Sequence, residues 1–88
     1  MKTSDEEFQK ARVNLSITPG EMLKTVRELQ GLSQNELAKL SGISQSNISA
    51  IENGTRNIGR ERALTFGKIL KVHPAVILFP DFDIEEVA

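Results

Sequence analysis

The sequence predicts an all-α fold with five helices in residues 18–79. Two observations carry this prediction. Apolar residues recur at helical spacing in several short stretches, and good helix caps and turn residues separate those stretches. Residues 1–17 are expected to form an N-terminal arm, and residues 80–88 an acidic C-terminal tail.

The first two helices begin at the same kind of signal. In Thr18-Pro19-Gly20-Glu21 a threonine cap is followed by a proline suited to the first turn and by the glutamate of a capping box. Ser33 and Glu36 repeat the capping box. Gly31 and Gly42 stand where the two apolar patterns stop. We therefore expect one helix to end at Gly31 and the next to turn at Gly42, since glycine enters positive φ without steric strain.

Three further helices are expected after that turn. Ser44 caps the first of them, in which Ile48 and Ile51 are three residues apart and can both face inward. Helical periodicity returns in residues 60–70, and two prolines bound a last short helix over residues 74–78.

The arm has two local patterns. Residues 4–12 begin with acidic residues and could form a short helix. Val13, Leu15 and Ile17 alternate with polar residues, which is the period of a strand. A lone strand is unstable in water, so this segment either pairs with the same strand of a second subunit or lies as an extended arm on the core.

Composition excludes several classes of function. The chain has no Cys and a single His, His73, which leaves no disulfide, thiolate metal site or multi-histidine metal site. We expect neither a metal nor a cofactor. No paired-carboxylate cleft, activated nucleophile or phosphate-binding glycine loop is evident, so we expect no enzyme. There is no apolar run of about 18 residues and no signal-like N-terminus, so we expect a cytoplasmic protein that does not enter a membrane.

Charge is unevenly distributed along the chain. The formal net charge is −1, but residues 18–71 carry eight Lys or Arg and five Glu, whereas residues 72–88 carry four acidic residues and no Lys or Arg. Because phosphates respond to the local surface rather than to the total, the middle of the chain remains compatible with nucleic acid.

The outward face of the third predicted helix is unusual for a solvated helix, where Lys and Glu usually dominate. It is expected to carry short polar side chains and a single charge, that of Glu52. Such a face suits base edges and phosphates. Its polar members are Gln45, Ser46, Asn47, Ser49 and Asn53.

These residues together resemble a known family. Gln34, Ala38, Gly42 and Ile48, with Ile51-Glu52-Asn53-Gly54, resemble the phage-repressor/Cro-type (XRE) helix-turn-helix over about residues 19–79. The resemblance implies a five-helix, lambda-repressor-like domain that binds double-stranded operator DNA as a two-fold homodimer and represses transcription.

The resemblance also assigns roles to individual residues. Gln34 is implied to brace Gln45 as well as to bind phosphate. Two readings remain open beside DNA binding: Gln34 and Gln45 could be ordinary solvent-facing amides, and the domain could be a protein-interaction module that has lost DNA binding. The implied base-reading residues are Gln45, Ser46, Asn47 and Ser49, and the implied phosphate-binding residues are Gln34, Asn53, Thr55 and Arg56.

A finer resemblance is to HigA-type antitoxins, in the runs ITPGEML, ENG-x-R-N-x-G and KVHPAVILFP. It implies repression of the protein's own operon and neutralisation of a basic RelE-like ribonuclease toxin, which an acidic tail would complement. The alternatives are a phage, plasmid or restriction–modification control repressor without a toxin, and a tail that is simply solvated. Candidate toxin contacts are Phe8, Val13, Leu15, Asp81, Asp83, Glu85 and Glu86, and candidate homodimer contacts are Val76, Ile77, Phe79 and Phe82.

Overall fold

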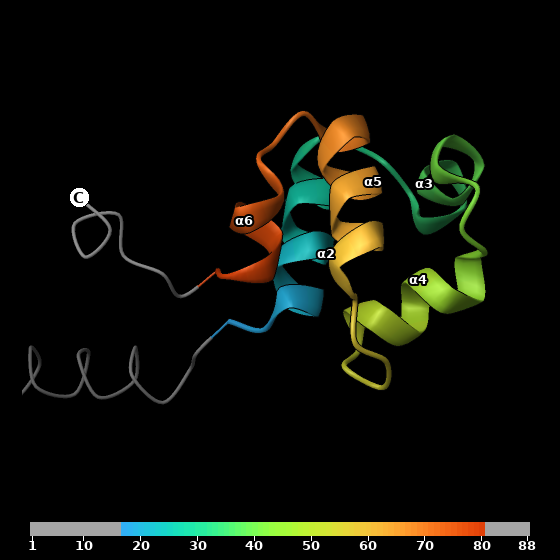
Figure 1. Ribbon diagram of the computed structural model, residues 1–88. Coiled ribbons are helices and arrows are strands. Elements are labelled where there is room, and N and C mark those ends of the chain that lie inside the picture. Colours follow the sequence, from blue (N-terminus) through green and yellow to red (C-terminus); the bar gives the residue numbers. More distant parts are fainter. Residues whose placement is uncertain (1–16, 81–88) are drawn as a thin grey trace, which may run out of the picture.

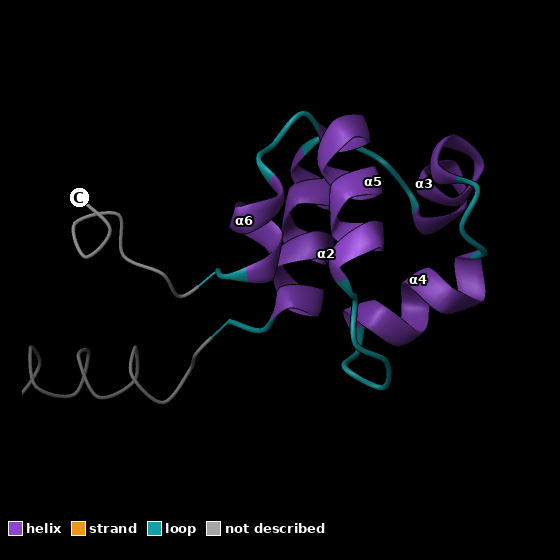
Figure 2. Cartoon of the chain, in the orientation of Figure 1, coloured by secondary structure: helices purple, strands orange, loops and turns teal. Residues whose placement is uncertain are grey.

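The computed structural model describes residues 17–80, and within that range every regular element is a helix (Figure 2). The predicted all-α fold is confirmed, and the helices fall where the sequence places them. The expected helix of residues 4–12, most of the alternating segment 13–17 and the tail from residue 81 lie outside the described residues. The described helices are α2 (Pro19–Leu29), α3 (Gln34–Ser41), α4 (Gln45–Glu52), α5 (Arg60–Leu70) and α6 (Pro74–Leu78).

Both predicted capping boxes are present. At α2 the Thr18 hydroxyl accepts the Glu21 N–H at 3.1 Å, and the Glu21 carboxylate accepts the Thr18 N–H at 3.0 Å. At α3 the corresponding distances between Ser33 and Glu36 are 3.0 and 2.8 Å. Because the carboxylates accept backbone N–H groups, the pKa values of Glu21 and Glu36 lie below their usual range. These local bonds fix where α2 and α3 begin.

Helix α2 lies at the centre of the arrangement. It packs against α4, α5 and α6, while α3 packs against α4 and α5 (Figure 1). In Figure 1, α5 and α6 stand beside α2 on one side of the molecule, and α3 and α4 form the other side. The chain thus has an α3–α4 end and an α5–α6 end joined through α2.

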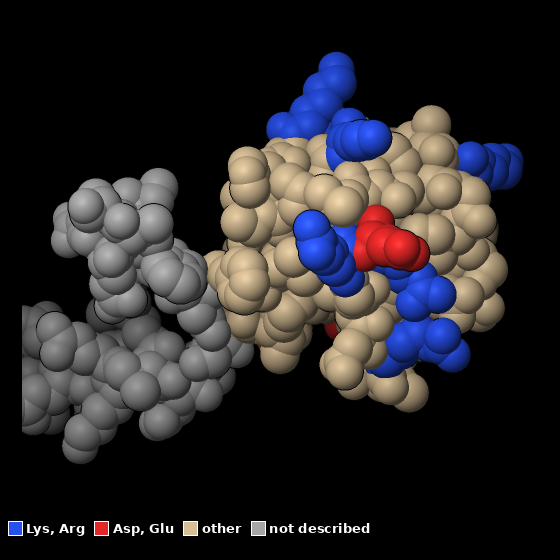
Figure 3. Space-filling model, viewed as in Figure 1, with Lys and Arg blue, Asp and Glu red and all other residues tan. Residues whose placement is uncertain are grey.

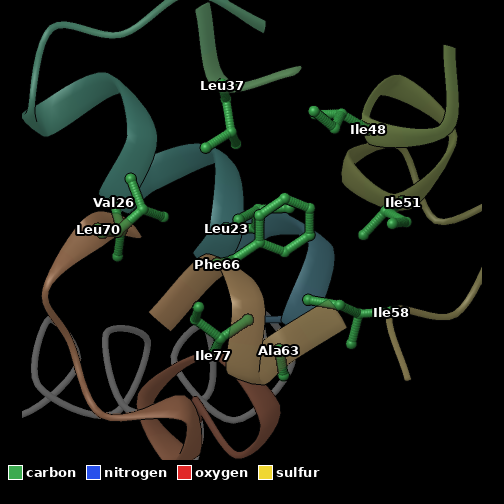
Figure 4. Packing of buried hydrophobic residues seen from close by; sticks show 10 residues of the cluster. All are labelled: Leu23, Val26, Leu37, Ile48, Ile51, Ile58, Ala63, Phe66, Leu70 and Ile77. Atoms are coloured by element: carbon green, nitrogen blue, oxygen red, sulfur yellow. The ribbon is translucent and has the colours of Figure 1, made fainter. Parts of the chain in front are cut away.

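One hydrophobic core holds both ends together. Phe66 from α5 lies in the middle of it, with Leu23 of α2 and Ile51 of α4 on neighbouring sides (Figure 4). Every helix contributes at least one side chain that is at most 1% exposed. The largest of these fully buried side chains are Leu23, Leu37, Ile48, Ile51, Phe66, Leu70 and Ile77.

Ile77 corrects one prediction. Its side chain is fully buried in the core of its own chain, so the expectation that it lies at a homodimer interface is wrong. The residues around it, Ala75 to Phe79, are all apolar, and such a run does not show which side of a helix faces inward.

Gly20 brings the start of α2 against the end of α4. A Cβ atom at this position would overlap the carbonyl oxygen of Ile51, so only glycine permits the observed approach of the two backbones. The contact fixes how α4 sits relative to the rest of the molecule.

Candidate nucleic-acid interface

Helix α4 presents an apolar side to the core and a polar side to the exterior. Ile48 and Ile51 point inward and are at most 1% exposed. Ser44 caps the helix by accepting the Asn47 N–H at 3.2 Å, as expected. The predicted base-reading residues line its outer side: Gln45 and Ser46 are exposed, and Asn47 and Ser49 are half-buried. The structure therefore places all four on one short helix at the surface.

The loop after α4 is tied back to that helix. The Asn53 side-chain oxygen accepts hydrogen bonds from the Thr55 N–H at 3.0 Å and the Thr55 hydroxyl at 2.6 Å. The Arg56 N–H donates to the Ala50 carbonyl at 3.1 Å. These bonds hold the exposed residues Thr55 and Arg56 next to the outer side of α4, while the Asn53 side-chain oxygen is occupied within the loop.

Positive charge is available on the same part of the surface. On the face shown in Figure 3, Lys and Arg side chains gather over the start of α5 and the loop before it, with acidic atoms beside them. Arg27 is the one cation that forms a salt bridge within residues 17–80. Exposed Arg56 and Arg60 have no acidic side chain within salt-bridge distance in that range. Both can therefore approach a phosphate without first breaking an ion pair in that part of the chain.

Glu52 does not lie on the outward face, which corrects a second prediction. Its side chain is 3% exposed and forms a bidentate pair with Arg27, whose side chain is 8% exposed. The Glu52–Arg27 distances are 2.7 Å from Oε2 to Nε and 2.9 Å from Oε1 to Nη2. The hydrogen bonds that Arg27 donates to the Glu52 carboxylate raise the pKa of Arg27 above its usual value.

Spacing could have revealed this pair. Glu52 follows Ile48 by four residues and Arg27 follows Leu23 by four, so each lies on the inward side of its helix. Since one cation and one anion leave the surface together, the net charge of the exposed groups in residues 18–71 stays positive.

A chain of hydrogen bonds continues from the pair to the surface. Glu52 Oε1 also accepts from Gln34 Nε2 at 3.0 Å, and Gln34 Oε1 accepts from Gln45 Nε2 at 2.6 Å. The contact between Gln34 and Gln45 that the family resemblance implies is therefore present. Their roles toward DNA stay predictions.

The remaining predicted sites are partly outside the described range. Val76 and Phe79 are 42% and 57% exposed, and Leu64 on the neighbouring α5 is 45% exposed. The other candidate homodimer residue, Phe82, and the candidate toxin contacts Phe8, Val13, Leu15, Asp81, Asp83, Glu85 and Glu86 lie outside the described residues. No group of three or more metal-binding side chains occurs among residues 17–80, and none of the helices there is long and apolar enough to cross a bilayer.

Comparison with known proteins identifies the family. A helix-turn-helix family model matches residues 23–77, which includes α3, the glycine turn and α4. The chain belongs to this XRE-type helix-turn-helix family. The predicted family resemblance is thereby confirmed, whereas the finer resemblance to HigA-type antitoxins stays a prediction.

Two transcriptional regulators are similar in sequence to this chain. The HTH-type transcriptional repressor RghR of Bacillus subtilis (strain 168) is 36% identical over 69 residues, which cover 77% of this chain and 51% of RghR. The HTH-type transcriptional regulator PuuR of Escherichia coli (strain K12) is 40% identical over 57 residues, which cover 65% of this chain and 29% of PuuR. The chain therefore spans about half or less of the length of these relatives.

A solved structure shares the fold. The restriction–modification controller protein C.AhdI from Aeromonas hydrophila aligns with a TM-score of 0.66 and 32% sequence identity. The alignment covers 70% of this chain and 94% of C.AhdI.

Proposed function

We propose that this chain is a sequence-specific DNA-binding transcriptional repressor that acts as a homodimer. The observation that carries the proposal is the outer side of α4: exposed, short polar side chains begin at Gln45, whose amide is held in place by Gln34. An α-helix fits the major groove of B-DNA, and a glutamine amide matches the N6 and N7 atoms of adenine.

The surroundings of α4 support phosphate binding. Arg56 follows the helix in a loop that is hydrogen-bonded back to it, and Gln34 stands at the first position of α3. The N–H groups at the start of a helix favour an anion. Contacts of this kind position a protein on the duplex, while the α4 side chains would discriminate between bases. Membership of the helix-turn-helix family and the names of its relatives as transcriptional regulators agree with this division.

Homodimer formation is part of the same proposal. Two recognition helices must stand about 34 Å apart to enter successive major grooves of one face of DNA. The α5–α6 end exposes apolar side chains, including Leu64 and Val76. In Figure 1, α6 lies on the side of the molecule away from α3 and α4. Pairing of two chains through this end would leave both α4 helices free to face DNA.

Selection from random DNA tests the proposal. The wild-type chain is incubated with a pool of random duplex oligonucleotides, and the bound fraction is amplified and sequenced. We expect enrichment of a two-fold symmetric site that binds at least about 1,000-fold more tightly than a scrambled duplex of equal composition. Bound and unbound pools with the same sequence distribution would overturn the proposal.

We propose two alternative finer roles for the chain, each supported by a different observation. Similarity to C.AhdI over 94% of that protein supports a control repressor without a toxin partner. The antitoxin-like runs in the sequence and the acidic residues from Asp81 onward support an antitoxin that neutralises a RelE-like ribonuclease toxin.

Genomic context and co-purification separate the two roles. A short neighbouring gene for a basic RelE-like protein, whose product forms a stable complex with this chain, would establish the antitoxin. If such a product forms no complex, or the neighbouring genes encode a restriction enzyme and methyltransferase, the antitoxin role is excluded.

A further inference from the structure

We propose that the buried Arg27–Glu52 pair determines base specificity by fixing which way the Gln45 amide presents its donor and acceptor to DNA. The proposal rests on the proposed DNA-binding function and adds a specificity-determining role for two residues that do not reach the surface. Their link to the outer side of α4 is the hydrogen-bond chain from Arg27 through Glu52 and Gln34 to Gln45.

The first step is the orientation of Gln34. An ionised carboxylate only accepts hydrogen bonds, so a glutamine side chain facing it must present its NH2 group. Glu52 Oε1 lies 3.0 Å from Gln34 Nε2. Because the oxygen and nitrogen of an amide point away from each other, Gln34 Oε1 is turned toward α4.

The second step is the orientation of Gln45. Gln34 Oε1 is itself only an acceptor, and it lies 2.6 Å from Gln45 Nε2. One hydrogen of that NH2 group is therefore engaged by Gln34. The other hydrogen and Gln45 Oε1 stay available, on defined sides of the amide, for a base edge.

A fixed amide can discriminate where a free one cannot. Adenine offers a donor at N6 and an acceptor at N7, and these must meet the glutamine oxygen and nitrogen in the correct order. An amide that turns over freely presents both orders and so accepts base pairs that the fixed amide rejects. Loss of the anchor should therefore reduce discrimination between bases more than it reduces overall affinity.

Burial makes the anchor strong enough for this role. The side chains of Arg27 and Glu52 are 8% and 3% exposed, so water competes little for their hydrogen bonds. Arg27 Nη1 additionally donates to the Leu32 carbonyl at 2.7 Å, which holds the guanidinium between α2 and the start of α3. A carboxylate at the surface would move and could not set the orientation of Gln34.

Two variants break the chain at different points. The double substitution Arg27→Met with Glu52→Met removes both charges together and so leaves no unpaired buried ion. Gln34→Met leaves the pair intact and cuts its link to Gln45. The matched control is Gln30→Met, which removes a glutamine amide whose Nε2 donates to the Leu70 carbonyl at 2.5 Å, outside the Arg27–Gln45 chain.

Binding is measured on the duplex selected by the wild-type chain and on duplexes in which each A·T pair is inverted in turn. At the base pair read by Gln45, we expect the ratio of affinities for the selected and the inverted duplex to fall about tenfold in the double variant and in Gln34→Met. At the other base pairs this ratio should not change. The Gln30→Met control should discriminate as the wild type does. Wild-type discrimination in Gln34→Met would overturn the proposal, and so would wild-type discrimination in a double variant that circular dichroism shows to be folded.

NMR of the side-chain amides tests the orientation without DNA. We expect the Gln45 NH2 signals of the wild type to be shifted and slow to exchange, and to become like those of a free glutamine in both variants but not in Gln30→Met. Gln45 signals that are already free in the wild type would overturn the inference. Should the wild-type chain select no DNA site, the proposed function fails, whereas these spectra still decide whether the pair orients Gln45.

Discussion

The outer side of α4 and the α5–α6 end of this domain expose opposite kinds of surface. At the α3–α4 end, Gln34 and Gln45 form an ordered polar chain that is anchored on a buried ion pair. At the α5–α6 end, Leu64 and Val76 leave apolar area open to solvent. An ordered polar surface suits recognition of base edges, and an apolar one suits association with another copy of the chain. We therefore propose that the α3–α4 end reads DNA and that the α5–α6 end joins two copies of the chain, and we name them the reading end and the assembly end.

The largest expected effect on stability comes from removing one partner of the Arg27–Glu52 ion pair. Arg27→Ala leaves the Glu52 carboxylate buried without its partner, and we expect it to lower the free energy of unfolding by about 3–5 kcal/mol. Urea denaturation of the wild type and the variant measures this difference. The Arg27→Met, Glu52→Met double variant should be at least as stable as the wild type. A single variant of unchanged stability would show that the reading end does not depend on this anchor.

Alanine substitutions at Gly20 and Gly67, where two backbones approach closely, test whether the two ends act independently. Gly20→Ala pushes against Ile51, and Gly67→Ala places a Cβ 2.8 Å from the Val72 carbonyl oxygen beside α6. We expect each to lower stability by about 1–3 kcal/mol. Only Gly20→Ala should also weaken binding to the selected duplex in chains that remain folded, because only Gly20 supports α4. Equal losses of DNA affinity per folded chain would contradict the division.

Val76→Asp tests the assembly end. Val76 is 42% exposed and lies in the first turn of α6, where a carboxylate is tolerated, so the stability of the single chain should change by at most about 0.5 kcal/mol. We expect the dimer fraction in analytical ultracentrifugation without DNA to fall sharply, since a charge cannot be buried unpaired in an apolar contact. The matched control is Leu40→Asp at the exposed apolar residue of α3, which should leave the dimer unchanged. Loss of the dimer in Leu40→Asp alone would show that the interface lies at the α3–α4 end and would contradict the proposed assembly end.

The smallest expected effect is a pH dependence shared by α2 and α3. The pKa values of Glu21 and Glu36 are lowered in the folded chain by hydrogen bonds from the caps. Their contribution to stability is therefore fully present above the unfolded pKa of about 4.3 and is lost as the pH falls through the lower folded values. Carboxyl NMR titration should give midpoints below about 4.3 for both residues. Glu36→Gln, which keeps the hydrogen bond but does not titrate, should lose less stability in acid, and an unchanged pH dependence would contradict the capping role.

Local signals make most of the fold predictable. Ser33 and Glu36 lie three residues apart, and Gly42 supplies the left-handed turn at φ 75°, so adjacent residues decide where these helices begin and end. The inward positions of Ile48 and Ile51 likewise follow from spacing alone. These features need no knowledge of distant contacts.

Features that depend on distant residues are harder to predict. The sequence predicts Glu52 on the outward face of its helix. Its partner, Arg27, belongs to another helix, and the sequence around Glu52 does not indicate that partner. Ile77 is expected at an interface because an apolar run does not show which side meets the core. Nothing in the sequence around Gly20 indicates that this residue lies against the backbone of Ile51. Local patterns thus predict which residues lie on the outer side of α4, and helical spacing could have placed Arg27 and Glu52 on the inward sides of their helices. That these two residues pair with each other does not follow from local patterns.

The most direct test of DNA reading by α4 compares Gln45→Ala with Arg56→Ala on the selected duplex and on its single-base variants. We predict that Gln45→Ala loses about 1–3 kcal/mol on the selected site and the preference at one base pair of each half-site. Arg56→Ala should instead weaken binding to all duplexes alike and reduce the slope of log affinity against log salt by about 0.9 for each phosphate that the variant no longer neutralises. A Gln45→Ala variant that keeps the wild-type preference at every base pair would contradict the reading role of α4.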